Sequence, residues 1–349
     1  MELVRLPETT QTLYAELMEQ AIQAAAQRAT TPAVPGTFVS KHVKGRRYWY
    51  VQISRGDRKE QHYLGPDSPA LADWMEGQRA VRGDERAQRR QRARLCSMLV
   101  AGGATSESAS ITRVLRVLED AQTFRLGGVL VGTLAFRCYG NLLGVRFERE
   151  ASRTQDIDVA HDPDVAIALK DRAPASDLPK ALTEGPLGFL AVPGLDSRTP
   201  ATSFKIRGRE LRVDFLTPQR GRTSAKPVFL EAFQLAAQPI AGLEYLLEDT
   251  VQAVVVGSED VLVNVPSPAR FALHKLVLAR SRPATFQTKA LKDLRQAGQL
   301  LAILASDRPA DITEAWSRMA RSRRAARLMR EALRRLDEYI QVAVAPHIV

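Results

Sequence analysis

Residues 128–159 read GVLVGTLAFRCYGNLLGVRFEREASRTQDIDV, and this stretch carries the strongest indication of the fold. Its apolar opening predicts a buried strand, the Gly132-Thr133 step predicts a turn, and residues 134–143 predict a helix. Residues 156–159 predict a second strand. A glycine just before a helix lets the backbone approach a ligand closely, and the N–H groups of a helix N-terminus bind phosphate oxygens. We therefore expect a phosphate-binding turn here, to which Thr133 adds a hydroxyl donor.

Acidic side chains mark this second strand and a later one. Asp156 and Asp158 are two residues apart, so they share one face of a strand, where two carboxylates repel unless a cation lies between them. Asp214 follows an apolar run on another predicted strand. An Asp-x-Asp pair alone is more often a turn or a surface pair, and Asp214 alone fits an exposed strand position. Taken with Gly132 and Thr133, the three carboxylates favour a site for one or two divalent ions that bridge nucleoside triphosphate phosphates.

The other metal-binding side chains restrict the type of metal. Cys96 and Cys138 have no CxxC spacing, and the five histidines are scattered along the chain. A disulfide framework, a zinc site and a histidine-built metal centre are therefore not expected. A metal held by carboxylates alone would be a hard cation, Mg²⁺ or Mn²⁺.

Composition and periodicity divide the chain into four expected units around an α+β fold with a mixed-sheet core. They are an N-terminal helix and linker (1–36), a small basic antiparallel sheet with an arginine-rich helix (37–100), the core (101–265) and a C-terminal helical domain (266–349). Within the core, residues 204–207 and 211–216 predict a hairpin that turns at 208–210 and carries Asp214. The C-terminal domain is expected to hold helices at 269–280, 288–304, 312–319 and 325–342.

The chain is strongly basic, with a formal net charge of +11 and a pI of about 9.9. Such an excess attracts nucleic acids and nucleotide phosphates, but it also fits a merely basic surface. Residues 37–63 interleave arginines with tyrosine and tryptophan, which suits either base stacking or the small core of a sheet. No apolar run has the length of a membrane span and the first residues do not resemble a secretion signal, so we expect a cytoplasmic protein with no membrane partner.

The succession of Gly132-Thr133, Asp156-x-Asp158 and Asp214 resembles the polymerase β-type nucleotidyltransferase superfamily, in which Thr133 stands at a position usually occupied by serine. The similarity extends over residues 124–304 and is greatest to the bacterial nucleotidyltransferase-like proteins, which include toxins paired with antitoxins. Residues 213–215, 268–276 and 292–294 match the later motifs of that toxin-type branch. Gly132 and Asp156 are 24 positions apart, about twice the usual span, so residues 143–155 must form an insertion that lets the chain return to the sheet.

The resemblance implies metal-assisted attack of an acceptor hydroxyl on the α-phosphate of a nucleoside triphosphate, with release of pyrophosphate. In this scheme Asp156 and Asp158 hold the metal, and Asp214 is either a third ligand or the general base. The implied nucleotide-binding residues are Gly132, Thr133, Arg212, Lys275 and Asp293, although an ion pair with a neighbouring cation suits Asp293 equally well.

The acceptor stays open among an RNA end, a protein and a small molecule, with nucleic acid, in particular tRNA, favoured by the basic N-terminal region. An antitoxin partner follows only from the resemblance. The competing hypothesis is a nucleic-acid-binding or regulatory protein on a transferase fold that has lost turnover.

Overall fold

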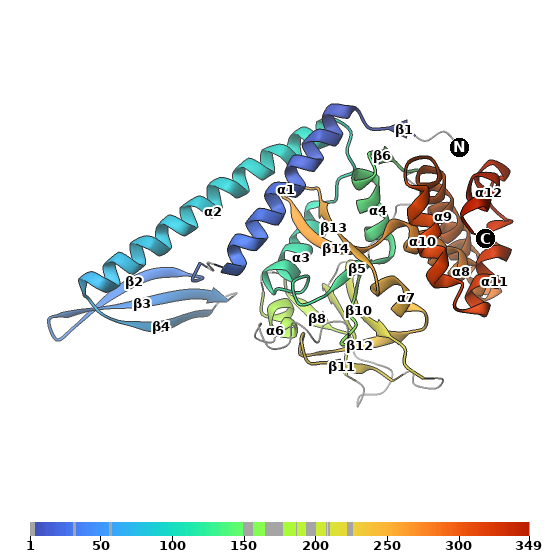
Figure 1. Cartoon of the computed structure of the whole chain (residues 1–349). Helices are drawn as coiled ribbons and strands as arrows, with labels where there is room; N and C mark the ends of the chain where they lie inside the picture. Colours follow the sequence, from blue (N-terminus) through green and yellow to red (C-terminus); the bar gives the residue numbers. More distant parts are fainter. Residues whose placement is uncertain are drawn as a thin grey trace.

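The computed structural model describes residues 4–30, 33–55, 58–148, 156–164, 177–185, 187–192, 200–206, 208, 210–221 and 226–348. It is an α+β structure with a central mixed sheet, small antiparallel sheets and a C-terminal group of helices, which confirms the predicted fold class (Figure 1). None of the helices in these ranges combines the length and the apolar content that crossing a bilayer requires.

Within the described residues, seven strands form the central sheet. The main path runs β11-β12-β10-β7-β5, and β9 and β8 extend it from the side of β10. Strand β10 is parallel to β7 and β12, whereas β5, β9, β8 and β11 pair antiparallel with their neighbours. The strands are β5 (Val129–Val131), β7 (Asp156–Ala160), β8 (Phe189–Ala191), β9 (Ser203–Ile206), β10 (Arg212–Pro218), β11 (Val228–Leu230) and β12 (Leu235–Ile240).

Burial alternates along the two central strands. Ile157 on β7 and Val213 and Phe215 on β10 are fully buried, while the residues between them are partly exposed. Because successive side chains of a strand point to opposite faces, the acidic positions lie on the opposite face from this apolar core. The predicted hairpin that carries Asp214 is confirmed as the antiparallel pair β9 and β10.

Further helices and short sheets enclose this sheet. Helix α4 (Gly132–Leu142) follows β5 directly, so Gly132 and Thr133 begin the helix and do not form the separate turn that the sequence predicted. The hairpin of β13 (Thr250–Val255) and β14 (Val261–Pro266) packs beside α4 (Figure 1). The remaining elements are α3 (Ala109–Asp120), α6 (Leu178–Thr183), α7 (Leu243–Leu247) and the pair β1 (Val4–Arg5) with β6 (Val145–Arg146).

The C-terminal region is helical, as predicted. Its helices are α8 (Pro268–Ser281), η2 (Ala284–Phe286), α9 (Gln287–Asp307), α10 (Pro309–Met319), α11 (Arg323–Leu333), α12 (Glu338–Val344) and η3 (Ala345–His347). The single helix predicted for 325–342 is wrong, because a break at 334–337 separates α11 from α12. At the break Leu336 packs against the core, and its apolar side chain continued the helical spacing in the sequence.

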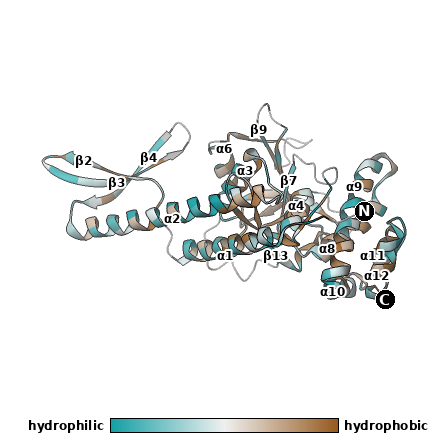
Figure 2. Cartoon of the chain, turned by 90° about the horizontal axis from the view of Figure 1, so that it is seen from above, coloured by the Kyte–Doolittle hydropathy of each residue, from teal (hydrophilic) through white to brown (hydrophobic). Residues whose placement is uncertain are grey.

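In the N-terminal region, α1 (Glu8–Thr30) packs on the β13–β14 hairpin, whereas the sheet of residues 37–66 and most of α2 (Pro69–Ala101) extend away from the body (Figure 1). Helix α1 packs beside α2, and β2 (Thr37–Val43), β3 (Arg46–Arg55) and β4 (Arg58–Pro66) form a three-stranded antiparallel sheet at the far end of α2. The Ser68 hydroxyl caps α2 by accepting from the Leu71 N–H, as expected for a serine before Pro69. Figure 2 shows this region as largely hydrophilic, with the apolar residues concentrated in the body.

Three sequence predictions fall partly or wholly on residues outside the described ranges. They concern the linker residues 31–32, positions 207 and 209 at the turn of the hairpin, and residues 149–155 of the predicted insertion. The chain returns to the sheet after the predicted insertion, because β7 begins at Asp156 and pairs with β5.

Candidate active site

Strand register brings the predicted carboxylates to one place. In the parallel pair of β7 and β10, Asp158 lies opposite Asp214 and Asp156 lies opposite Arg212. On its other side Asp158 pairs with Val131 of β5. Neighbouring strands are about 4.8 Å apart, so the three acidic residues occupy adjacent positions on one face of the sheet.

Gly132 lies directly against Asp158. Its φ of +68° is in the left-handed region that favours glycine, and a Cβ at this position would lie 2.3 Å from Asp158 Oδ2. Helix α4 begins at the same residue and has no side-chain cap, so backbone N–H groups of its first turn lie beside the carboxylates without a side-chain acceptor. Gly132 is therefore required both by its backbone conformation and by its contact with Asp158.

The pKa of Asp158 is raised by its burial beside two other carboxylates. Burial raises it to about 6 from the ordinary value of 3.8, and the negative charges of Asp214 and Asp156 add to the rise. Lys275 and Arg212 oppose the shift without cancelling it. An approaching cation would consequently stabilise the ionised form of Asp158.

Asp214 is paired in this structure with the hairpin on which it lies. Arg212 Nε donates to Asp214 Oδ1 at 2.6 Å, and the Ser203 hydroxyl donates to the same oxygen. Arg212 Nη2 also donates to Ser203 Oγ at 3.0 Å. Ser203 was not predicted as a site residue, although its position opposite Asp214 in the hairpin register could have indicated it.

Asp293 contacts two cations of the C-terminal helices. Lys275 Nζ lies 2.7 Å from Asp293 Oδ1, and Arg282 Nε lies 2.6 Å from Asp293 Oδ2. Asp293 is only 2% exposed, so its carboxylate contacts Lys275 and Arg282 and has little contact with solvent. The structure thus shows Asp293 fixing the position of Lys275, whose charge in turn acts on Asp158.

Lys292 is a second residue that the sequence analysis did not include in the site. Burial lowers its pKa and Lys275 lowers it further, whereas Asp293, Asp156 and Asp158 raise it. Lys292 therefore lies within electrostatic reach of the carboxylates. His274, next to Lys275, is neutral at pH 7 because burial lowers its pKa to about 4.

A comparison with protein families agrees with this arrangement. A family described as nucleotidyltransferase matches residues 109–321, which is 213 of the 349 residues. The chain belongs to this nucleotidyltransferase family. The match contains every predicted site residue and leaves out α1, α2 and the sheet of β2, β3 and β4. Neither the curated proteins nor the solved structures contain a match.

The donor groups of this nucleotidyltransferase fit a hard divalent cation in their chemistry, because carboxylates are the ligands that Mg²⁺ and Mn²⁺ prefer. Within the described ranges, however, no three acidic, histidine or cysteine side chains are already gathered around a common point. In this structure Asp214 directs one carboxylate oxygen toward the Arg212 guanidinium.

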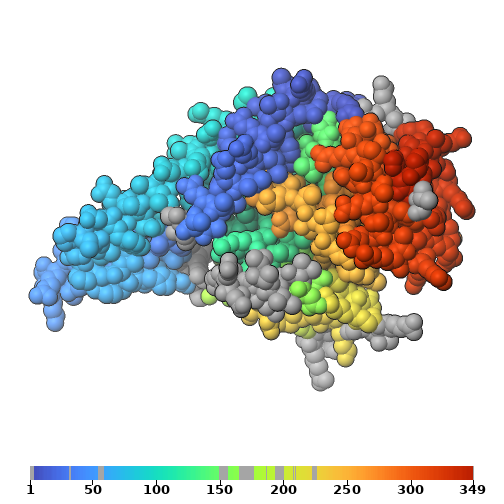
Figure 3. All heavy atoms as spheres, viewed as in Figure 1, coloured from blue at the N-terminus to red at the C-terminus, as the bar shows by residue number. Residues whose placement is uncertain are grey.

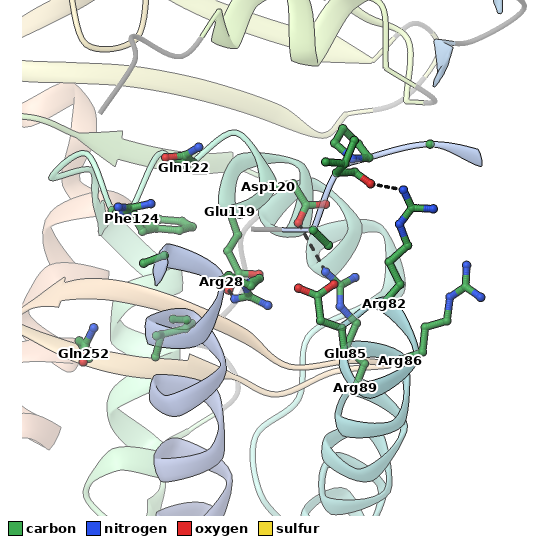
Figure 4. Close-up of a pocket in the computed structure, with 18 of the residues that line it drawn as sticks. Arg28, Arg82, Glu85, Arg86, Arg89, Glu119, Asp120, Gln122, Phe124 and Gln252 are labelled. Atoms are coloured by element: carbon green, nitrogen blue, oxygen red, sulfur yellow. Dashed lines mark hydrogen bonds and ion pairs between the residues drawn. The ribbon is translucent and has the colours of Figure 1, made fainter. Parts of the chain in front are cut away.

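A cleft of about 880 Å³ lies elsewhere in the nucleotidyltransferase, between α1, α2 and the β13–β14 hairpin (Figure 4). None of the predicted site residues lines it. Its charged walls are paired across the cleft, with Arg28 3.0 Å from Glu119 and Arg89 3.9 Å from Asp120. These ion pairs join the two long helices to the end of α3, so we interpret the cleft as a joint between the N-terminal region and the body.

Proposed function

We propose that this nucleotidyltransferase moves a nucleoside monophosphate from a nucleoside triphosphate to an acceptor hydroxyl with the help of Mg²⁺ or Mn²⁺. The observation that carries the proposal is the position of Asp158, which lies opposite Asp214, two residues from Asp156 on the same strand, and against the N-terminus of α4. A site that concentrates carboxylates beside the N-terminus of a helix suits a metal-bound triphosphate.

Each residue has a role in this proposal. The backbone N–H groups at Gly132 and Thr133 hold phosphate oxygens, and the Thr133 hydroxyl adds a donor. Lys275 and Lys292 balance the negative charge that the phosphates bring to the site. Arg212 moves from Asp214 to a phosphate when the nucleotide binds, which leaves the Asp214 carboxylate available.

The bond changes are those of an in-line displacement. The acceptor oxygen forms a bond to the α-phosphorus while the bond from that phosphorus to the bridging oxygen breaks, and pyrophosphate leaves. Asp156, Asp158 and Asp214 would hold the metal, which when bound supplies neutralisation of the phosphate charge and a lower acceptor pKa. Asp214 either completes the ligand set or accepts the proton of the acceptor hydroxyl.

Label transfer tests the proposal. Each of the four nucleoside triphosphates, labelled at the α-phosphorus, is incubated with the protein, Mg²⁺ and separate RNA, protein and small-molecule fractions of a cell extract. We expect label in one fraction, abolished by EDTA and by Asp158→Asn but not by Asp84→Asn, which changes an exposed carboxylate on α2. Absence of transfer from every nucleotide into every fraction would overturn the proposal.

A second candidate function rests on the ion pair of Asp214 with Arg212. A carboxylate that is already neutralised fits a nucleic-acid-binding or regulatory protein on a transferase fold without turnover. Such a protein would bind nucleotide without transferring label. Equilibrium binding of a triphosphate with and without Mg²⁺, measured beside the transfer assay, distinguishes the two functions.

The proposal also includes an acceptor and a biological role. The chain's net charge of +11 favours an RNA acceptor, with tRNA as the first to be tested, in the cytoplasm. The resemblance to the toxin-type branch adds a toxin role with an antitoxin partner. Induced expression of the wild type and of Asp158→Asn tests this role, which predicts growth arrest only with the wild type.

A further inference from the structure

The N-terminal region carries most of the excess charge of the molecule. We call residues 37–101, which comprise β2, β3, β4 and α2, the arm. The arm has 14 Lys and Arg against 7 Asp and Glu, a net of 14 − 7 = +7 out of the chain's +11. It lies wholly outside the segment that matches the nucleotidyltransferase family, so its function is not supplied by that match.

One face of the arm's sheet is occupied by α2. The Phe38 and Trp74 rings lie 5.7 Å apart, and the Arg82 guanidinium lies 4.6 Å above the Phe38 ring. Val51 on the same face is buried at 5% exposure. These contacts form the small apolar core of the arm and fix the sheet on the helix.

The opposite face carries aromatic and basic side chains. Tyr63 contacts Tyr50 with ring centroids 5.4 Å apart and Tyr48 at 6.2 Å, and Lys41 Nζ lies 4.9 Å from the Tyr50 ring. Arg46 shares this face because it is two residues from Tyr48 on β3. We call Lys41, Arg46, Tyr48, Tyr50 and Tyr63 the tyrosine face.

The tyrosine face is open to solvent. Tyr63 is 56% exposed, and Lys41 and Arg46 are exposed as well. The arm projects from the body in Figures 1 and 3, and of its described residues Leu95, Cys96 and Leu99 at the C-terminal end of α2 belong to the core cluster with α1. Helix α2 has 33 residues and is about 50 Å long, and the sheet packs along its N-terminal part, while residues 33–36, which lead into β2, line the cleft beside Glu119.

We propose that the tyrosine face binds single-stranded nucleic acid. Tyrosine rings on an open sheet stack on unpaired bases, and cations beside them contact the phosphates. The net charge of +7 on the arm complements a polyanion, whereas a protein interface would have fewer charges and more apolar area at its centre. The proposal is independent of the transfer reaction, because none of the proposed catalytic residues lies on the arm.

Fluorescence anisotropy of the full chain with unstructured oligonucleotides tests the proposal. The probes are RNA and DNA of one sequence, about 20 nucleotides long to exceed the roughly 4–16 that single-strand-binding folds cover. Tyr63→Ala should weaken binding on the order of tenfold or more without changing its salt dependence. Arg46→Gln should lower the slope of log Kobs against log salt by about 0.7, the contribution of one phosphate contact.

Matched controls come from the C-terminal helices. Tyr339→Ala removes a tyrosine that is 45% exposed, and Arg327→Gln removes an arginine whose side chain is 69% exposed, so neither should alter binding. Photocrosslinking of a 4-thiouridine RNA to the wild-type protein, followed by peptide mapping, should place the contacts on β3 and β4 without relying on any variant.

The results distinguish single-stranded RNA or DNA from a duplex and from a membrane surface as the partner of the tyrosine face. Binding of RNA over DNA, or of DNA over RNA, supports the proposal and identifies the nucleic acid by its 2′-hydroxyl. The proposal is overturned by absence of binding, by binding that neither Arg46→Gln nor Tyr63→Ala changes, or by preference for a duplex. Binding to vesicles of phosphatidylglycerol that is as tight as binding to the oligonucleotides would also overturn it. Vesicles of phosphatidylcholine, which has no net charge, are the control.

Discussion

Replacing Asp158 by asparagine should stabilise the metal-free protein, although it removes a residue of the proposed active site. Burial and two neighbouring carboxylates raise the pKa of Asp158 from 3.8 to about 6. Because each pKa unit corresponds to about 1.4 kcal/mol, ionising this side chain costs the folded state about 3 kcal/mol. Asp158 keeps some contact with solvent, which reduces the expected gain in the free energy of unfolding to about 1–3 kcal/mol.

The pH dependence of this gain has a definite sign. A folded-state pKa above the unfolded value means that the folded protein binds more protons between about pH 4 and pH 6, so the wild type loses stability as pH rises through this window. The advantage of Asp158→Asn should therefore be complete near pH 7.5 and fall to about one third near pH 4.5. Chemical denaturation of both proteins in EDTA at the two pH values measures it.

Added Mg²⁺ should reverse the order of stability. At about 100 times its Kd, a metal that binds only the folded state stabilises the wild type by about 2.7 kcal/mol and leaves Asp158→Asn unchanged. Asp84→Asn, which changes an exposed carboxylate on α2, is the matched control and should behave as the wild type does. A metal-free wild type that is more stable than Asp158→Asn at pH 7.5 would refute the reasoning, because it would mean that the neighbouring cations stabilise the Asp158 charge.

Three further predictions follow from the same geometry. Gly132→Ala should destabilise the protein by at least about 1–2 kcal/mol more than Gly188→Ala in thermal unfolding, because both have a positive φ but only the first places a Cβ against Asp158. Asp293→Asn should cost about 3–5 kcal/mol in chemical denaturation by leaving buried cations unpaired, whereas Glu331→Gln, at an exposed ion pair, should cost under about 1 kcal/mol. Mg²⁺-dependent nucleotide binding, measured by calorimetry, should weaken as pH falls through about 6, because Asp158 then takes up a proton. Binding that is independent of pH from 5 to 8 would contradict the role of Asp158 in holding the metal.

Local periodicity was sufficient to predict the strands and helices around the site. The two-residue spacing of Asp156 and Asp158 and the alternation around Asp214 predicted one shared face, and the register of β7 with β10 places these residues side by side. The helix after Gly132 and the serine cap before Pro69 also follow from short-range rules. Such features depend on neighbours within a few residues, so a single sequence contains them.

Contacts between distant elements could not be obtained in the same way. Lys292 and Asp293 are adjacent on α9, about 100° apart around the helix axis, and only the packing of α9 on α8 determines that Asp293 faces Lys275. The pairing of Arg212 with Asp214 in place of a phosphate depends on a choice of rotamer. The division between α11 and α12 was missed because Leu336 continues the apolar spacing through the break.

The most direct test of the central claim compares two labels on the nucleotide that supports transfer. With Mg²⁺ present, label at the α-phosphorus should appear in the acceptor and label at the γ-phosphorus should appear in pyrophosphate in equal amount, and both signals should be lost in Asp158→Asn. Transfer of the γ-label to the acceptor, or release of γ-labelled orthophosphate without any α-label in the acceptor, would contradict nucleotidyl transfer at Asp156, Asp158 and Asp214.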